Sequence, residues 1–348
     1  ILRCLVGSEM CIRDSMNGSK PALITPGDPS GIGPEIALKA WSEGQKNIVL
    51  MGDIEHLSSV ALAAGLNITF TSFDSTVSLS AEKCSVWKID WQVMPCVGQS
   101  DPRNASTIVE SIKQAVKQVK QGQFSAIVTS PIAKSVLYEN GFEFPGQTEF
   151  LAKLDSPESF PVMMLANSAL RVVPLTIHIP LSDVEKTITT ALFKRTIKIL
   201  DTALRQYFNC PFPRIAIAGL NPHAGEDGHL GRFETDKLIP LIQVQEIEKT
   251  SLLGPFSADT LFYSEKRDSY DVVLCMYHDQ ALIPVKTIDF YRTVNITLGL
   301  SFIRTSPDHG TAFDRAARFD SHPGSIISAI TVSYTHLTLP TNGGVLWS

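Results

Sequence analysis

The stretch Asp271-Val-Val-Leu-Cys-Met-Tyr-His-Asp-Gln280 decides the fold class, because a short apolar run gives way abruptly to polar residues. Asp271 to Met276 has the length and the β-branched content of a buried strand, and His278 follows where that strand would end. Two other runs have the same form, each with a histidine after it: Leu170 to Ile177 before His178, and Arg214 to Leu220 before His223. The strand ends of open α/β sheets are where such proteins bind ligands.

Short apolar runs alternate with longer segments of helical period along most of the chain, as in FSAIVTS followed later by the helical stretch from Asp183 to Gln206. This alternation predicts an α/β fold with a largely parallel sheet. The length of 348 residues favours two domains, with a crossing near Ser130 to Phe144, where Pro and Gly interrupt the pattern. We expect a first lobe of residues 16–140 plus 305–331 and a second lobe of residues 141–304.

Bulk composition limits the partners of the chain. A net charge of −5 with no dense Lys/Arg block argues against nucleic acid, and no apolar run approaches the ~18 residues that cross a bilayer. The six cysteines are scattered and lack a C-x-x-C pair, so we expect them to be reduced. These features predict a cytoplasmic protein that binds a small molecule, without nucleic acid or membrane.

Both ends of the sequence differ from the rest. Residues 1–15 show neither helical nor strand period, and Met16 is the expected start of translation. Residues 332–348 break off the helical pattern of HPGSIISAIT. We expect both segments to be non-native additions and exclude them from fold reasoning.

The three histidines form a candidate metal site. A single histidine in a polar loop is more often structural, but three in equivalent positions point to shared ligation by neutral imidazoles. Three imidazoles leave positions open for substrate oxygens, and Asp279 or Glu226 could orient an imidazole. Their wide spacing matches no short zinc signature, so the identity of the metal stays open.

Two further segments carry candidate binding groups. The loop from Pro26 to Glu35 lies between a strand and a helix and suits either a tight turn or an anionic ligand, although it lacks both the Walker and the G-x-G-x-x-G patterns. Lys286, Asn295 and Arg304 follow His278 at intervals of eight or nine residues through what reads as strand-like runs with short breaks. Such donors can converge on a phosphate or carboxylate, although a single Lys or Arg is more often a solvated charge.

Several blocks together resemble one family. ITPGDPSGIGPE, GLNPHAGEDGHLG, ADTLF, MYHDQALIPVK, VNITLGLSFIRTSPDHGTAFD and HPGS are similar to the 4-hydroxythreonine-4-phosphate dehydrogenases of pyridoxal phosphate biosynthesis, and the likeness runs from about Pro21 to Ile330. The resemblance implies a two-lobed fold like that of isocitrate and isopropylmalate dehydrogenases. It also implies a homodimer, with the active site in the cleft between lobes at the subunit interface and one ligand histidine supplied by the partner chain.

The resemblance also assigns roles to residues. It implies NAD or NADP as cofactor and one divalent metal, zinc, magnesium or cobalt, held by His178, His223 and His278. The other implied contacts are with the phosphorylated substrate at Gln147, Thr148, Lys286, Asn295 and Arg304, and with the cofactor at Gly31, Gly310 and Thr311. The first lobe would be the cofactor side, and the second lobe would bind metal and substrate and form the dimer.

The implied reaction oxidises the C3 alcohol of 4-phosphohydroxy-L-threonine and then decarboxylates the product to 3-amino-2-oxopropyl phosphate. Lys286, or Asp279 through water, would act as the base, and Asp259 is a further candidate ligand or orienting group.

Gln147 stands where the family commonly has histidine, so this position cannot carry a positive charge, although its amide can donate to a phosphate. Two alternatives stay open: a paralogue acting on 4-phosphothreonate, 4-phosphoerythronate or a cis-dihydrodiol, and a metal-dependent phosphatase or phosphate-binding protein.

Overall fold

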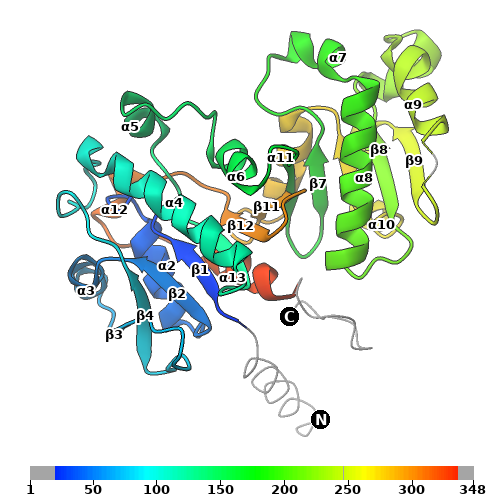
Figure 1. The fold of residues 1–348 in the computed structure, drawn as a ribbon. Coiled ribbons are helices and arrows are strands. Elements are labelled where there is room, and N and C mark those ends of the chain that lie inside the picture. The colour runs from blue at the N-terminus through cyan, green and yellow to red at the C-terminus, as the bar shows by residue number, and fades with distance from the viewer. Residues whose placement is uncertain (1–19, 246, 336–348) are drawn as a thin grey trace, which may run out of the picture. The chain divides into compact units, whose positions relative to one another are not determined.

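The computed structural model describes residues 20–245 and 247–335, which form two compact units (Figure 1). The first unit contains residues up to 157 and residues 301–334, and the second contains residues 158–300. Residues 141–157 and 301–304, which the sequence assigned to the second lobe, pack with the first unit. The expected leader at 1–15 and the tail beyond residue 335 lie outside the described residues. Within the described ranges, no helix is both long and apolar enough to cross a membrane.

The first unit is built on a parallel sheet with the strand order β3-β4-β2-β1-β5-β12. The strands are β1 (Ala22–Thr25), β2 (Ile48–Gly52), β3 (Thr69–Ser72), β4 (Lys83–Lys88), β5 (Ala126–Thr129) and β12 (Ile303–Pro307). The helices are α2 (Gly33–Ser42), α3 (Ile54–Ala63), α4 (Ala105–Lys120), α5 (Lys134–Glu139), α6 (Gln147–Asp155), α12 (Phe313–Ala316) and α13 (Gly324–Thr335), with a 3₁₀ turn η1 (Pro102–Asn104). The central strands β1, β2 and β5 are buried along their whole length, as expected for a parallel sheet covered on both faces.

The second unit has the strand order β11-β6-β7-β10-β8-β9. Its strands are β6 (Val162–Ala166), β7 (Arg171–Pro174), β8 (Arg214–Ala218), β9 (Ser251–Phe256), β10 (Val272–Cys275) and β11 (Val294–Leu298). The helical segments are α7 (Val184–Thr187), α8 (Thr190–Tyr207), α9 (Ile239–Gln243), α10 (Ser264–Arg267) and α11 (His278–Ile288), with the shorter η2 (Leu181–Asp183), η3 (Pro222–Gly228), η4 (Glu234–Leu238) and η5 (Ala258–Thr260). Strands β7, β10, β8 and β9 are parallel, whereas β6 is antiparallel to both β7 and β11. The structure therefore confirms the predicted α/β class, with an antiparallel part in the second unit.

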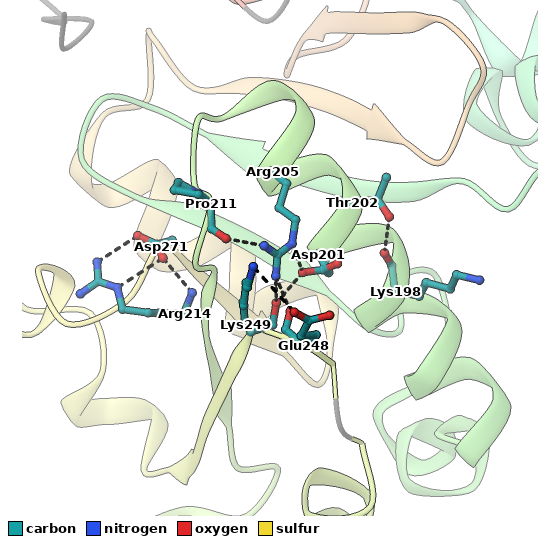
Figure 2. A network of polar contacts seen from close by, with 10 residues as sticks. Lys198, Asp201, Thr202, Arg205, Pro211, Arg214, Glu248, Lys249 and Asp271 are labelled. Atoms are coloured by element: carbon teal, nitrogen blue, oxygen red, sulfur yellow. Dashed lines mark hydrogen bonds and ion pairs between the residues drawn. The ribbon is translucent and has the colours of Figure 1, made fainter. Parts of the chain in front are cut away.

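Ion pairs and hydrogen bonds fix the amino ends of β8 and β10 (Figure 2). The guanidinium group of Arg214, at the start of β8, donates to the carboxylate of Asp271 just before β10, with an Nη2–Oδ1 distance of 2.9 Å. Nearby, Arg205 of α8 binds the carboxylate of Asp201 at 2.8 Å and donates to the Glu248 carbonyl at 2.8 Å. The contact of Arg214 with Asp271 thus ties β8 to β10 at the end opposite to the histidines, and the Arg205 contacts tie α8 to the segment before β9.

Two predicted elements differ from the structure. The segment from Ala281 was read as strand-like runs, but its first part is the helix α11, which contains Pro284, and only the later runs form the strands β11 and β12. Its buried residues Ala281, Leu282 and Val285 have helical spacing and pack into the core of the second unit, and this burial outweighs the disruption by proline.

The other difference concerns the C-terminal helix. Helix α13 does not end at residue 331 but continues through Thr335, with Val332 and Ser333 buried. The Tyr334 hydroxyl also accepts a hydrogen bond from the Ala22 amide at 3.2 Å.

Candidate functional site

Three strands of the second unit end side by side, and each leads to one of the predicted metal ligands. The order β7-β10-β8 is parallel, with Cys275 opposite Pro174 and Leu274 opposite Ile217. The carboxyl ends of these strands therefore share one edge of the sheet. The chain passes from this edge into the segments that carry His178, His278 and His223, respectively.

Two of the histidine rings lie close together. The ring centroids of His178 and His278 are 5.8 Å apart. His278 begins helix α11, and its Nδ1 atom is 2.7 Å from Oδ1 of Asp279, as the sequence anticipated for an orienting carboxylate. This contact would leave Nε2 of His278 for a metal ion.

His223 is exposed in the turn η3, near Asp259 of η5. The pKa of the exposed Asp259 carboxyl group is lowered, mainly by a hydrogen bond from the Ser257 hydroxyl, with a smaller contribution from the nearby His223. Asp259 is therefore an anion at neutral pH and lies where the sequence suggested a further ligand or orienting group.

His178 and His278 lie close together in one chain, but two imidazoles alone do not complete the ligand set of a divalent metal ion. Further ligands must be added to this pair. Within the described residues, no group of three or more His, Cys, Asp or Glu side chains is close enough to hold a metal. The pair His178 and His278 supplies two imidazoles, one of them with a carboxylate partner, which is a combination common in zinc and related sites. Ligation by all three histidines stays a prediction.

The loop that carries His223 has an unusual backbone. Five consecutive residues from His223 to Asp227 have positive φ angles between 42° and 83°, in the left-handed region. Only Gly225 adopts this conformation without penalty, since a left-handed turn costs roughly 1–2 kcal/mol for each other residue. Such a conformation persists only where surrounding contacts hold it, and it is frequent at functional sites.

The fully buried carboxylate of Glu234 holds this loop. Its oxygens accept hydrogen bonds from the amides of Leu220 at 2.7 Å and Asn221 at 2.8 Å, and from the Asn221 side chain at 2.9 Å. A Cβ atom on Gly225 would lie only 2.7 Å from Oε2 of Glu234. Glu234 could not be predicted from the sequence, because the residue lies outside the loop that it stabilises.

The role of Gln280, two residues after His278, could not be predicted from the sequence either. Its Oε1 atom accepts from the Met276 amide at 2.7 Å, and its Nε2 atom donates to the Gly219 carbonyl at 2.7 Å. One side chain thus connects the carboxyl end of β10 with that of β8. The only sequence signal was its place in the motif MYHDQ.

The first unit contains the buried cation Arg304. Its side chain, on β12, donates from Nε and Nη2 to the Thr129 hydroxyl at 3.1 and 2.8 Å. Burial lowers the pKa of the guanidinium group to about 10, although the nearby Glu149 opposes this shift. Arg304 therefore remains charged at neutral pH, as an anion-binding residue must.

The predicted substrate residues Gln147 and Thr148 begin helix α6 in the same unit. The Gln147 amide nitrogen donates to the Ser130 carbonyl at 2.9 Å, while its Oε1 atom is buried and has no hydrogen-bond partner among the described residues. The Ser130 carbonyl thus fixes the orientation of the amide and takes one of its two N–H groups. Thr148 is half-buried beside it.

Lys286 and Asn295 belong to the second unit. Lys286 lies on α11, with its ammonium nitrogen 5.8 Å from the ring centroid of Phe290. Asn295 is half-buried on β11, and its Oδ1 atom has no hydrogen-bond partner in the described ranges. The predicted substrate residues thus form two sets, one in each unit.

The predicted cofactor residues Gly31 and Thr311 are neighbours in the first unit. The Ile32 amide donates to the Thr311 carbonyl at 3.0 Å, and a Cβ atom on Gly31 would lie 2.8 Å from the same oxygen. Gly310 has open space around it instead. The close packing explains glycine at position 31 by itself, so cofactor binding there remains a prediction.

These observations define the class of the molecule: an α/β protein with two compact units, in which three parallel strands of the second unit end at one edge and lead to histidines. The family follows from sequence comparison. The family model of the pyridoxal phosphate biosynthetic protein PdxA matches residues 44–333, and the chain belongs to this family. The resemblance noted in the sequence is therefore confirmed.

Known relatives agree with this assignment. The chain is 46% identical over 312 residues to the 4-hydroxythreonine-4-phosphate dehydrogenase of Ruegeria sp. (strain TM1040), covering 89% of this chain and 94% of that protein. A crystal structure of the 4-hydroxythreonine-4-phosphate dehydrogenase from Klebsiella pneumoniae superposes with a TM-score of 0.83 at 33% identity, covering 91% of this chain and 98% of the other. A terephthalate 1,2-cis-dihydrodiol dehydrogenase from Burkholderia xenovorans LB400 shares the fold, with a TM-score of 0.64 at 24% identity, covering 91% and 98% of the two chains.

Proposed function

We propose that this protein is a 4-hydroxythreonine-4-phosphate dehydrogenase that requires NAD or NADP and one divalent metal ion. It would oxidise the C3 alcohol of 4-phosphohydroxy-L-threonine to a ketone, with release of a proton and transfer of a hydride to the nicotinamide. The resulting β-keto acid would lose carbon dioxide to give 3-amino-2-oxopropyl phosphate. The observation that carries this proposal, beside family membership, is that the three candidate ligands follow adjacent parallel strands.

His178, His223 and His278 would hold the metal ion, and zinc, magnesium and cobalt all suit this role. When bound, the metal would favour ionisation of the substrate alcohol and stabilise negative charge on the ketone oxygen. Asp279 would keep the His278 ring in one orientation through its contact with Nδ1. Gly31, Gly310 and Thr311 are the proposed cofactor contacts.

Arg304 would bind the phosphate of the substrate, since its guanidinium group is buried and can donate to phosphate oxygens in a bidentate way. Lys286, Asn295, Gln147 and Thr148 are the other proposed substrate contacts. Lys286, or Asp279 through a water molecule, would take the proton from the C3 hydroxyl group.

We further propose that the active form is a homodimer in the cytoplasm whose active sites are shared between subunits. Two of the imidazoles lie close together in one chain, and the described residues hold no complete ligand set. A histidine from the partner chain would complete it.

The test is NADH or NADPH formation by the full-length protein with 4-phosphohydroxy-L-threonine, before and after treatment with a chelator. We expect reduction of the nicotinamide that stops on chelation and returns when a divalent metal is added back. No reduction with any phosphorylated candidate substrate, on folded and metal-loaded protein, would contradict the proposal.

We also keep open a second candidate, a paralogue acting on 4-phosphothreonate or 4-phosphoerythronate, because this chain departs from the family at position 147. Gln147 is neutral and its amide is bound to Ser130, so this position contributes no charge to phosphate recognition. Including both acids in the same assay decides between these substrates through their ratios of kcat/KM.

A further inference from the structure

Polar contacts tie the carboxyl end of β8 to that of β10. Gln280 bridges the two strand ends, because its amide binds the Gly219 carbonyl at 2.7 Å on one side and the Met276 amide at 2.7 Å on the other. The Met276 carbonyl in turn accepts from the Thr176 hydroxyl at 2.7 Å, two residues before His178. The segments leading to all three histidines are thus joined by hydrogen bonds.

Glu234 extends this network into the loop that carries His223. Its carboxylate binds the amides of Leu220 and Asn221, the two residues directly after Gly219. A Cβ atom on Gly219 would lie 2.8 Å from Cα of Ala224, so the loop folds closely back onto the strand end. Gln280 of α11 therefore binds Gly219, and Glu234 of η4 binds the two residues that follow it. Together they hold three successive residues of the segment after β8.

We propose that Gln280 and Glu234 are positioning residues that hold the His223 loop in a fixed conformation at the carboxyl end of β8. This inference rests on the proposed function, in which His223 is a metal ligand. The left-handed backbone from His223 to Asp227 needs such support, because isolated chains rarely adopt it. Residues that orient metal ligands typically change affinity by 10–100-fold when they are lost.

The structure also offers a matched control at the other end of the same strands. Asp271 binds Arg214 at 2.9 Å and so ties the amino ends of β8 and β10, on the side away from the histidines. Asp271→Asn weakens the pairing of the same two strands without touching the histidine edge. A purely structural role for Gln280 predicts that both substitutions have the same consequences.

The experiment measures Co²⁺ affinity by titration calorimetry and thermal stability for the full-length protein and its variants. Gln280→Met removes both hydrogen bonds at similar volume, and Gln280→Glu keeps the acceptor for Met276 but loses the donor to Gly219. We expect both variants, and Glu234→Gln, to bind Co²⁺ at least ~10-fold more weakly, whereas Asp271→Asn loses stability but keeps its affinity. Unchanged affinity in Gln280→Met and Glu234→Gln, or an equal loss in Asp271→Asn, would overturn the inference.

A second measurement, amide hydrogen exchange without metal, separates this inference from the proposed function. We expect faster exchange across residues 220–229 in Gln280→Met and not in Asp271→Asn. Failure of the wild-type protein to bind Co²⁺ would contradict the proposed metal site. In that case the exchange data alone decide whether Gln280 orders the loop, and unchanged exchange refutes that role.

Discussion

Single residues show clearly what the sequence could and could not predict. The positions of His178, His223 and His278 at strand ends could be predicted, because apolar runs followed by polar loops mark those ends. Gln280 and Glu234 could not, because their partners are set by the pairing of β8 with β10 and by the folding back of a loop. The local sequence around a polar residue does not show which distant backbone group its side chain will bind.

Gln147 is a further case at this scale. The sequence showed that its side chain is a neutral amide in place of the imidazole that is common in the family. Only the structure shows that the Ser130 carbonyl takes one of its N–H groups. The amide therefore retains one N–H that can donate to a phosphate.

His56 gives a prediction about stability and pH. The side chain is 3% exposed, and burial lowers the pKa of its imidazole to about 4, against a partial opposing effect of Asp53. The unfolded chain takes up a proton near pH 6.5, whereas the folded chain does so only near pH 4, so acid favours unfolding between these values. The stability that depends on neutral His56 is therefore complete above pH 6.5 and decreases by about 3 kcal/mol as pH falls to 4.

Urea unfolding of the wild-type protein and of His56→Gln across this range checks the prediction. The variant cannot titrate at this position, so its stability should fall less between pH 6.5 and pH 4. His229→Gln, at an exposed histidine, serves as control and should behave like the wild-type protein. Parallel pH profiles for wild type and His56→Gln would show that the buried imidazole does not control acid stability.

At the scale of elements, the parallel strands were predictable and one helix was not. β8 and β10 are short, apolar and bounded by polar residues, which is a strong strand signal. The helix α11 contains Pro284, which read as a break between short strands, but the spacing of its buried residues is helical. Packing of that apolar face against the sheet decides the outcome, and proline content alone did not reveal it.

The left-handed turn η3 gives a prediction about a single glycine. Gly225→Ala adds a methyl group that would lie 2.7 Å from the Glu234 carboxylate, in addition to the strain of its φ of +83°. Gly65→Ala is the matched control, since Gly65 has a φ of +70° but no atom within 4 Å of the added methyl group. We expect Gly65→Ala to cost about 1 kcal/mol and Gly225→Ala about 1–3 kcal/mol more.

Chemical denaturation measures both values, and metal titration of the same proteins adds a second readout. Gly225→Ala should also bind Co²⁺ more weakly, because the loop that carries His223 must shift. Gly65→Ala should keep the wild-type affinity. Equal effects of the two substitutions on stability and affinity would mean that the contact with Glu234 has no special role.

At the scale of the whole molecule, the α/β class and the family could be predicted from sequence, and both are confirmed. The division into units was harder to predict, since residues 141–157 pack with the first unit and the C-terminal helix extends to Thr335. Both differences involve packing between segments distant in sequence, such as Tyr334 with Ala22. Periodicity describes one segment at a time and therefore did not reveal them.

The central claim is that His178, His223 and His278 hold one divalent metal ion that the reaction requires. The most direct test is the metal content of purified, metal-loaded protein, measured by atomic emission for wild type, His223→Ala and the control His229→Ala. We expect about one metal ion per site in the wild type and in His229→Ala, and loss of the bound metal in His223→Ala with an unchanged circular dichroism spectrum. Full metal occupancy in His223→Ala would contradict the claim.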